Sequence, residues 1–396
     1  MSRLRPVRFG RSAWLALAVL AALVVALAAP TRAEAIERNF VGSAQLDYHL
    51  VPLHAKGKTF PQAFDGFTTE LAGKLAVDFN DKLSANLKVC FGCHGFEADM
   101  MYFDYRVADE LNVRVGRFSP SFGAFNLRHD PANHRLADKP LPYDMGRMLR
   151  MREWNLGVMP SPFPDNGVEV NGTHWFGDVA QLDYALYGVS GFKGNAKGTD
   201  LDFTLSRSPQ AYYVDNNARP AGGGRVSLLL KLGEATDVSL GASGLAGTWD
   251  PDNRRLYVIA GSDLTVRHDK TTLRAEYLLR RQTFDTNDAS AFKYTLPSSG
   301  GDFFVKHGFY TELEQGVTES LDLVARFDGI HRVGNVEKDS ALSSKSTALR
   351  GTFGAAYALD RAFRLKASTE LWRFSDGDGT GRQTELGFHL GAVGTF

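Results

Sequence analysis

The sequence contains little cysteine, has no excess of charge of either sign and, beyond residue 35, has no long hydrophobic run. Two cysteines in 396 residues are too few for a small disulfide-stabilised scaffold. The 45 basic residues are matched by 45 acidic ones, which excludes the basic excess typical of nucleic-acid binding, so we expect no nucleic-acid partner. No stretch after residue 35 has 18 consecutive apolar residues, and the sequence therefore predicts no transmembrane helix there.

Glycine and aromatic residues are abundant instead. The chain has 40 glycines and 27 phenylalanines, and aromatic residues make up 11% of it. Hydrophobic residues amount to 43%, which is too much apolar material for a disordered chain. The composition therefore indicates a large folded protein.

The first 35 residues have the three parts of a secretory signal peptide. Four arginines and no acidic residue precede an apolar run over residues 13–29, and Ala33-Glu34-Ala35 provides a small-x-small cleavage pattern. A membrane anchor is the alternative, because 17 apolar residues approach a spanning length. We expect a cleaved signal peptide at 1–35 and a single domain at 36–396, with a mildly acidic mature chain.

Beyond residue 35 the hydrophobic pattern has a period of two. Between residues 67 and 79 one face carries apolar side chains such as Phe67 and Leu71, and the other carries Glu70 and Lys74. This segment is thirteen residues long, whereas strands of soluble proteins usually have about 5–6. The same alternation recurs over 83–89, 321–328, 363–371 and 386–396. It predicts barrel strands with one face towards lipid, and the polar faces give a predicted lumen lining of Glu70, Lys74, Lys88, Arg326 and Asp328.

The connections between these segments alternate in length. Short polar turns, such as 80–82 and 177–178, are followed by longer links, such as 52–66, 119–166 and 285–301. Short turns on one side and long loops on the other are typical of bacterial outer-membrane barrels. Counting the segments predicts an all-β transmembrane antiparallel barrel of about 16 strands, with both ends on the periplasmic side.

Two further features carry a resemblance to a known family. Phe396 ends the last alternating segment, and residues 113–118 (Val-Arg-Val-Gly-Arg-Phe) followed by 120–123 (Pro-Ser-Phe-Gly) look like the fifth strand and loop entry of porins. Over the whole mature chain the sequence resembles the outer-membrane porins. The resemblance implies a location in the bacterial outer membrane, contact with lipid and lipopolysaccharide, and a homotrimer. It also implies passive diffusion of small hydrophilic solutes and ion transport through a channel, without enzyme activity.

By the same resemblance, the link over 119–166 is a third loop that folds inward and narrows the channel. It contains six basic and five acidic residues, and a charged constriction sorts solutes by charge and diameter. An anion preference is therefore one hypothesis, and a solvated loop whose charges pair with one another is the alternative. The predicted constriction residues are Arg128, Arg135, Arg147, Arg150 and Arg152.

The two cysteines form the motif Cys90-Phe91-Gly92-Cys93-His94. This C-x-x-C-H pattern is the attachment signature of c-type haem, in which Cys90 and Cys93 would bond the porphyrin and His94 would be the metal ligand to its iron. The chain would then resemble the fused cytochrome–porins of iron-oxidising bacteria. The alternative function is accordingly an electron-transfer barrel with a redox-partner cytochrome. In those proteins, however, the motif precedes the barrel.

A second interpretation of the motif is structural. Phe91-Gly92 can form the centre of a tight turn, with Cys90 and Cys93 in a disulfide across it or as free thiols. A second axial haem ligand is not assigned by the sequence. The candidate residues are Met100, Met101, Met145, Met148 and Met151.

Overall fold

The computed structural model describes much of the chain beyond the predicted signal peptide. The described ranges are 36–50, 66–92, 95–144, 157–159, 161, 163–195, 203–207, 213–285, 301–334, 345–376 and 383–396. The signal peptide predicted for residues 1–35 therefore lies outside them. The same holds for the predicted site residues Cys93, His94, Arg147, Arg150 and Arg152, and for Met145, Met148 and Met151.

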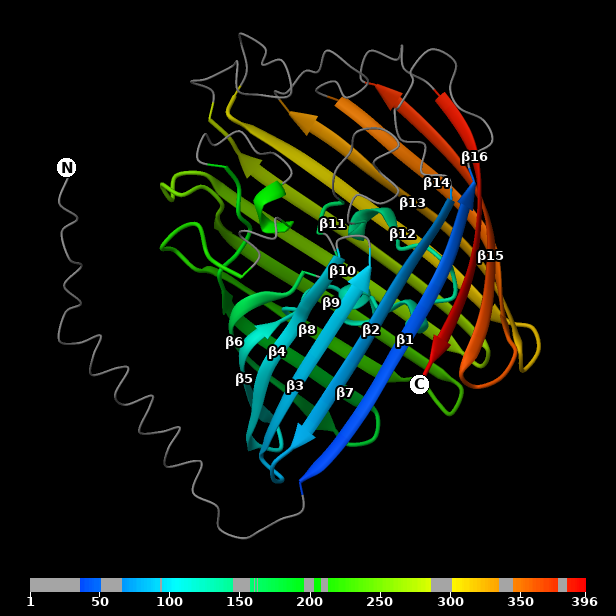
Figure 1. The fold of residues 1–396 in the computed structure, drawn as a ribbon, viewed down its shortest axis with the longest axis horizontal. Helices are drawn as coiled ribbons and strands as arrows, with labels where there is room; N and C mark the ends of the chain where they lie inside the picture. The colour runs from blue at the N-terminus through cyan, green and yellow to red at the C-terminus, as the bar shows by residue number, and fades with distance from the viewer. Residues whose placement is uncertain are drawn as a thin grey trace, which may run out of the picture.

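Sixteen strands of the described residues form one closed antiparallel barrel, in chain order, with the first strand beside the last (Figure 1). Their bounds are β1 Glu37–Leu50, β2 Gly66–Asp78, β3 Leu83–Gly92, β4 Gly95–Ala108, β5 Leu111–Phe118, β6 Asp165–Phe176, β7 Ala180–Val189, β8 Ala221–Lys231, β9 Thr236–Thr248, β10 Leu256–His268, β11 Thr271–Thr283, β12 Phe303–Gly316, β13 Leu321–Gly334, β14 Lys345–Ala358, β15 Phe363–Asp376 and β16 Gln383–Thr395.

The helical elements among the described residues are three or four residues long, about one turn each. They are α2 Ala124–Leu127 and the 3₁₀ helices η1 Pro131–Asn133, η2 Leu141–Tyr143 and η4 Thr204–Arg207. Among the described residues, none of the helices has both the length and the apolar character that a membrane crossing needs.

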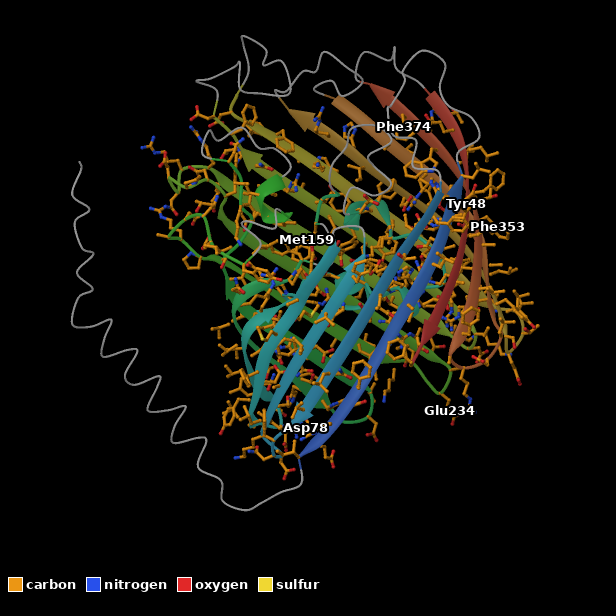
Figure 2. All side chains as sticks on the ribbon, viewed as in Figure 1. Tyr48, Asp78, Met159, Glu234, Phe353 and Phe374 are labelled. Carbon is orange, nitrogen blue, oxygen red and sulfur yellow. The ribbon has the colours of Figure 1, made fainter. Side chains whose placement is uncertain are left out.

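The strands form a barrel because each has one apolar and one polar face. In β2, Phe67 is 72% exposed on the outer surface while Ala72, of opposite parity, is buried. Phe353 lies at the outer edge of the barrel in Figure 2 and is likewise exposed. Large apolar side chains exposed on strand after strand are stable in contact with lipid rather than with water. The predicted transmembrane barrel is thus confirmed, and the strand expected over 67–79 is β2.

β1 and β16 pair with each other, and the C-terminal end of β16 lies towards the rim that carries the short turns, where Asp78 and Glu234 also lie (Figure 2). Gly42 of β1 and the terminal Phe396 exchange two backbone hydrogen bonds, of 2.8 and 3.1 Å. The Phe396 ring packs against the Phe40 ring, with 5.8 Å between the ring centroids. A side chain at position 42 would collide with this ring, since a Cβ there would lie 2.3 Å from it. Glycine therefore allows the last residue to close the barrel.

The link between β5 and β6 folds into the barrel. Its elements α2, η1 and η2 lie in the interior, behind β1 to β4 in the view of Figure 1. Phe122, Phe125 and Tyr143 of this link are almost completely buried, and they form the centre of an aromatic cluster that continues onto the inner wall with Tyr310. This arrangement confirms the predicted inward-folded third loop.

Candidate functional site

The third loop is fastened to the inner wall by polar contacts, of which the first involves Glu276 of β11. Its carboxylate accepts hydrogen bonds from the Phe125 backbone N–H at 2.7 Å, from the Tyr310 hydroxyl at 2.5 Å and from the Tyr143 hydroxyl. Burial and the adjacent Glu276 raise the pKa of Tyr143 well above its usual value. The Tyr143 hydroxyl therefore keeps its proton and remains a donor at neutral pH.

The second contact is a network of buried ions between the loop and strands β13 and β14. Arg326 donates to Asp138 Oδ1 at 2.8 Å, and Arg350 donates to both Asp138 and Asp328. The backbone N–H of Leu141 completes the network by donating to Asp328 Oδ2 at 3.0 Å. None of these four charged residues is more than 4% exposed. Buried ions need such pairing, because each unpaired charge carries a large desolvation penalty.

The third contact joins Lys88 of β3 to the segment after α2. Lys88 Nζ lies 2.9 Å from His129 Nε2 and 2.5 Å from Asp130 Oδ1. Burial and the Lys88 ammonium lower the pKa of His129 to about 4. The ring is therefore neutral at pH 7, and its Nδ1–H donates to the Asn126 carbonyl 2.7 Å away, while Nε2 accepts from Lys88.

A fourth contact comes from Lys366 of β15. Its Nζ donates to the carbonyl of Pro131 at 2.7 Å and to that of Leu136 at 3.2 Å. Together the four contacts hold the loop against β3, β11, β13, β14 and β15. The loop is therefore fixed to the inner wall and occupies part of the lumen.

An open cavity of about 720 Å³ remains between the loop and the wall formed by β5 to β11. Arginines outnumber carboxylates five to three in its lining. The arginines are Arg114, Arg128, Arg225, Arg267 and Arg274, and the carboxylates are Glu169, Asp183 and Asp237.

Most acidic partners of the lining arginines lie outside the cavity lining. Arg225 makes a bidentate pair with Asp263 at 2.5 and 2.8 Å. Arg114 pairs with Asp104 at 2.8 Å, although it also lies 3.3 Å from the lining residue Glu169. The lining therefore contains more guanidinium groups than carboxylates, although several of these guanidinium groups are ion-paired.

The structure places the predicted lumen residues as follows. Lys88, Arg326 and Asp328 are buried against the third loop, whereas Glu70 is partly exposed and Lys74 exposed on β2. Lys74 is the cross-strand neighbour of Lys88. The predicted lumen residues therefore include three that fasten the loop.

Of the predicted constriction residues within the described ranges, Arg128 lines the cavity and Arg135 does not. Arg135 instead pairs with Asp322 at 2.6 Å and with Glu314 at 3.2 Å. The sequence analysis missed Arg114, Arg225, Arg267 and Arg274, because it searched for the constriction in the loop alone. Each of the four lies on the polar face of a strand, and the period-two pattern of those strands was the signal that could have identified them.

The hairpin of β3 and β4 differs from the predicted one, which had its turn at Phe91-Gly92. Phe91 and Gly92 pair with Phe96 and Gly95 and so belong to the two strands of the hairpin. The prediction of a turn centred on Phe91-Gly92 is wrong, because both residues are paired within the strands. Cys90 consequently faces Glu97 across the ladder.

The thiol of Cys90 lies beside a buried ion pair. Its Sγ lies 3.7 Å from Asp99 Oδ2, and Asp99 is paired with Lys88 at 3.2 Å. A porphyrin at this thiol would displace buried ions from their partners. Met101 is 60% exposed on the lipid-facing side of β4, away from the lumen side that Cys90 faces.

No protein-family model matches the sequence, and no curated protein matches it either. Solved structures with a similar fold include the anion-selective porin from Comamonas acidovorans, with 12% identity, a TM-score of 0.56, and coverage of 91% of this chain and 100% of that one. The outer membrane channel DcaP of Acinetobacter baumannii has 9% identity, a TM-score of 0.56, and coverage of 91% and 97%. The trimer form of OmpT, an outer membrane protein of Vibrio cholerae, has 10% identity, a TM-score of 0.50, and coverage of 92% and 100%.

Proposed function

We propose that this protein is a channel of the bacterial outer membrane through which small hydrophilic solutes diffuse, and that it has no enzyme activity. The observation that carries the proposal is the polar cavity of about 720 Å³ inside a closed barrel whose exterior is apolar. A barrel of this size encloses a water-filled passage unless its interior is filled. Here the third loop fills part of the interior and leaves the cavity beside β5 to β11 open.

We further propose that the channel prefers anions. The five arginines that line the cavity exceed the three lining carboxylates, and fixed positive charge at a constriction attracts anions and repels cations. The likeness in fold to a solved porin described as anion-selective supports this preference.

Reversal potentials in planar bilayers under a salt gradient test the preference. We expect the wild-type channel to pass chloride more readily than potassium, and we expect Arg267→Glu to shift the reversal potential towards cation selectivity. Arg267 is exposed and lines the cavity. Arg361→Glu is the matched control, because Arg361 lies in the turn between β14 and β15 and outside the cavity lining. A cation-selective wild-type channel would contradict the proposal.

We propose a homotrimer as the assembly, with outer-membrane lipid and lipopolysaccharide against the remaining apolar exterior. OmpT of similar fold has been solved in a trimer form, and the barrel exposes aromatic and aliphatic side chains that a neighbouring copy can cover. Native mass spectrometry of protein extracted in mild detergent measures the subunit number. A monomer that persists at high protein concentration would contradict the trimer without affecting the channel proposal.

A further inference from the structure

A cluster of buried polar side chains lies where β1 and β16 close the barrel, beside the third loop. His49 and His389 are cross-strand neighbours whose ring centroids are 5.2 Å apart. Glu370 of β15 lies next to both rings, with Oε1 at 3.7 Å from His389 Nδ1 and Oε2 at 3.9 Å from His49 Nε2. Asp47 lies 3.7 Å from His389 Nε2, and Asp138 approaches from the loop. None of the five residues is more than 4% exposed.

Two members of this cluster have polar atoms that do not take part in a hydrogen bond. Within the described part of the chain, three buried atoms of these two residues have no hydrogen-bond partner. They are Nδ1 and Nε2 of His389 and Oε1 of Glu370. The separation of 3.7 Å between His389 Nδ1 and Glu370 Oε1 is too long for such a bond. Buried polar groups in native proteins are nearly always satisfied. A lone pair of imidazole and a carboxylate oxygen that face the same point are satisfied together by a cation.

We propose that His389, Glu370 and Asp138 bind one divalent transition-metal ion. One ligand atom from each of the three residues lies within 4.8 Å of the others. Two atoms bound to the same zinc ion at about 2.0–2.1 Å lie about 3.4 Å apart in a tetrahedral site. The distance of 3.7 Å between His389 Nδ1 and Glu370 Oε1 is therefore a few tenths of an ångström longer than a zinc site needs, and small side-chain shifts would shorten it to that value. Mixed imidazole and carboxylate ligands favour zinc, nickel or copper over magnesium and calcium, which prefer oxygen alone.

The neighbouring cation Arg350 leaves the metal-facing oxygen of Glu370 available. Arg350 donates to Asp138, and its Nη1 lies 4.0 Å from Glu370 Oε2. Trp372 Nε1 donates to the same Oε2 at 2.9 Å. The Oε1 atom points instead towards His389, so the metal and Arg350 engage opposite oxygens of one carboxylate, and both contact Asp138.

The proposed site has a consequence beyond solute diffusion. Asp138 belongs to the third loop, Glu370 to β15 and His389 to β16, so one metal ion would link the loop to the wall directly beside the seam that closes the barrel. Binding of the ion would stabilise the attachment of the loop to the wall, and its removal by a chelator would weaken that attachment.

Competition for zinc against a chromophoric chelator tests the site in detergent-solubilised protein. Cys90→Ser and Cys93→Ser are introduced first, because thiols are strong zinc ligands. We expect one equivalent of zinc per chain, and binding at least tenfold weaker in His389→Gln and in Glu370→Gln. His268→Gln is the matched control, since His268 lies 65% exposed near the turn after β10, and it should bind as tightly as the parent.

Two results would overturn the proposal. One is the lack of saturable binding near one equivalent, and the other is unchanged affinity in both cluster variants. If either variant fails to migrate as a folded barrel on an unboiled gel, X-ray absorption of the zinc-loaded parent decides. Nitrogen and oxygen ligands with imidazole scattering support the site, and a spectrum without imidazole overturns it. Neither measurement depends on conductance, so the outcome is independent of the channel proposal.

Discussion

Two buried histidines of the third loop, His129 and His134, have a lowered pKa, and His129 gives the sharper prediction because it contacts Lys88 of the wall directly. In the folded protein the pKa of His129 is lowered to about 4, whereas in an unfolded chain it is about 6.5. Between these values the unfolded chain binds a proton that the folded protein excludes. The contribution of His129 to the free energy of unfolding is therefore fully present above about pH 6.5 and is lost as the pH falls towards 4. The difference corresponds to about 3 kcal/mol.

We expect acidification from pH 7.5 to 4 to detach the loop segment near His129, because a protonated ring would face the Lys88 ammonium at 2.9 Å. Single-channel recordings over this range should show rising conductance and more frequent current steps. His129→Gln keeps a neutral side chain that accepts a hydrogen bond, and it should reduce this pH dependence. The same acid response in both proteins would show that another group is responsible.

Cys90 gives a second prediction for a single residue. Because its thiol adjoins the paired Asp99 and Lys88, we expect purified protein to give no haem stain in a gel and no reduced-haem absorption band. The measurement needs protein from outer membranes of cells that mature c-type cytochromes, with a known cytochrome as the positive control. A haem-stained band at the mass of this chain would restore the electron-transfer hypothesis.

At the scale of elements, the third loop depends on charges supplied by the strands. We expect Arg350→Met to leave Asp138 and Asp328 as buried carboxylates with fewer cations around them, and removal of one partner from a buried ion pair typically costs about 3–5 kcal/mol. The loop should then leave the wall, and single-channel conductance should rise and become noisier. Arg255→Met is the control, because Arg255 pairs with Asp285 away from the loop. Unchanged conductance in Arg350→Met would show that the other contacts suffice.

The strands could be predicted from the sequence, whereas the contacts between the loop and the wall could not. Strands such as β2 were predicted because alternation is a local property, written in consecutive residues. The contact between Asp138 and Arg350 joins residues 212 positions apart, and no local pattern indicates it. For the same reason the cavity-lining Arg225 was missed: its position on a polar face is a local property, but its place opposite the loop depends on closure of the whole barrel.

At the scale of the whole molecule, the apolar exterior predicts a position-dependent cost of charge. Leu390 lies in the middle part of β16 and Leu359 in a turn at the rim, and the two are similarly exposed, at 56% and 57%. An arginine costs about 2–4 kcal/mol at the bilayer midplane and about 0–1 kcal/mol near the interface. We therefore expect Leu390→Arg to lower the free energy of unfolding in lipid vesicles far more than Leu359→Arg does. Equal effects in denaturant titrations would contradict a lipid-facing exterior.

The pairing of β1 with β16 also removes the last open edges of the sheet. Until the last strand arrives, the first strand has an unpaired edge, and open edges readily pair with other chains. The contact between Gly42 and Phe396 joins residues far apart in the sequence, so its loop-closure entropy is large. Until β1 and β16 pair, the sheet keeps open, aggregation-prone edges, and a chain without the last strand would remain a sheet without closure.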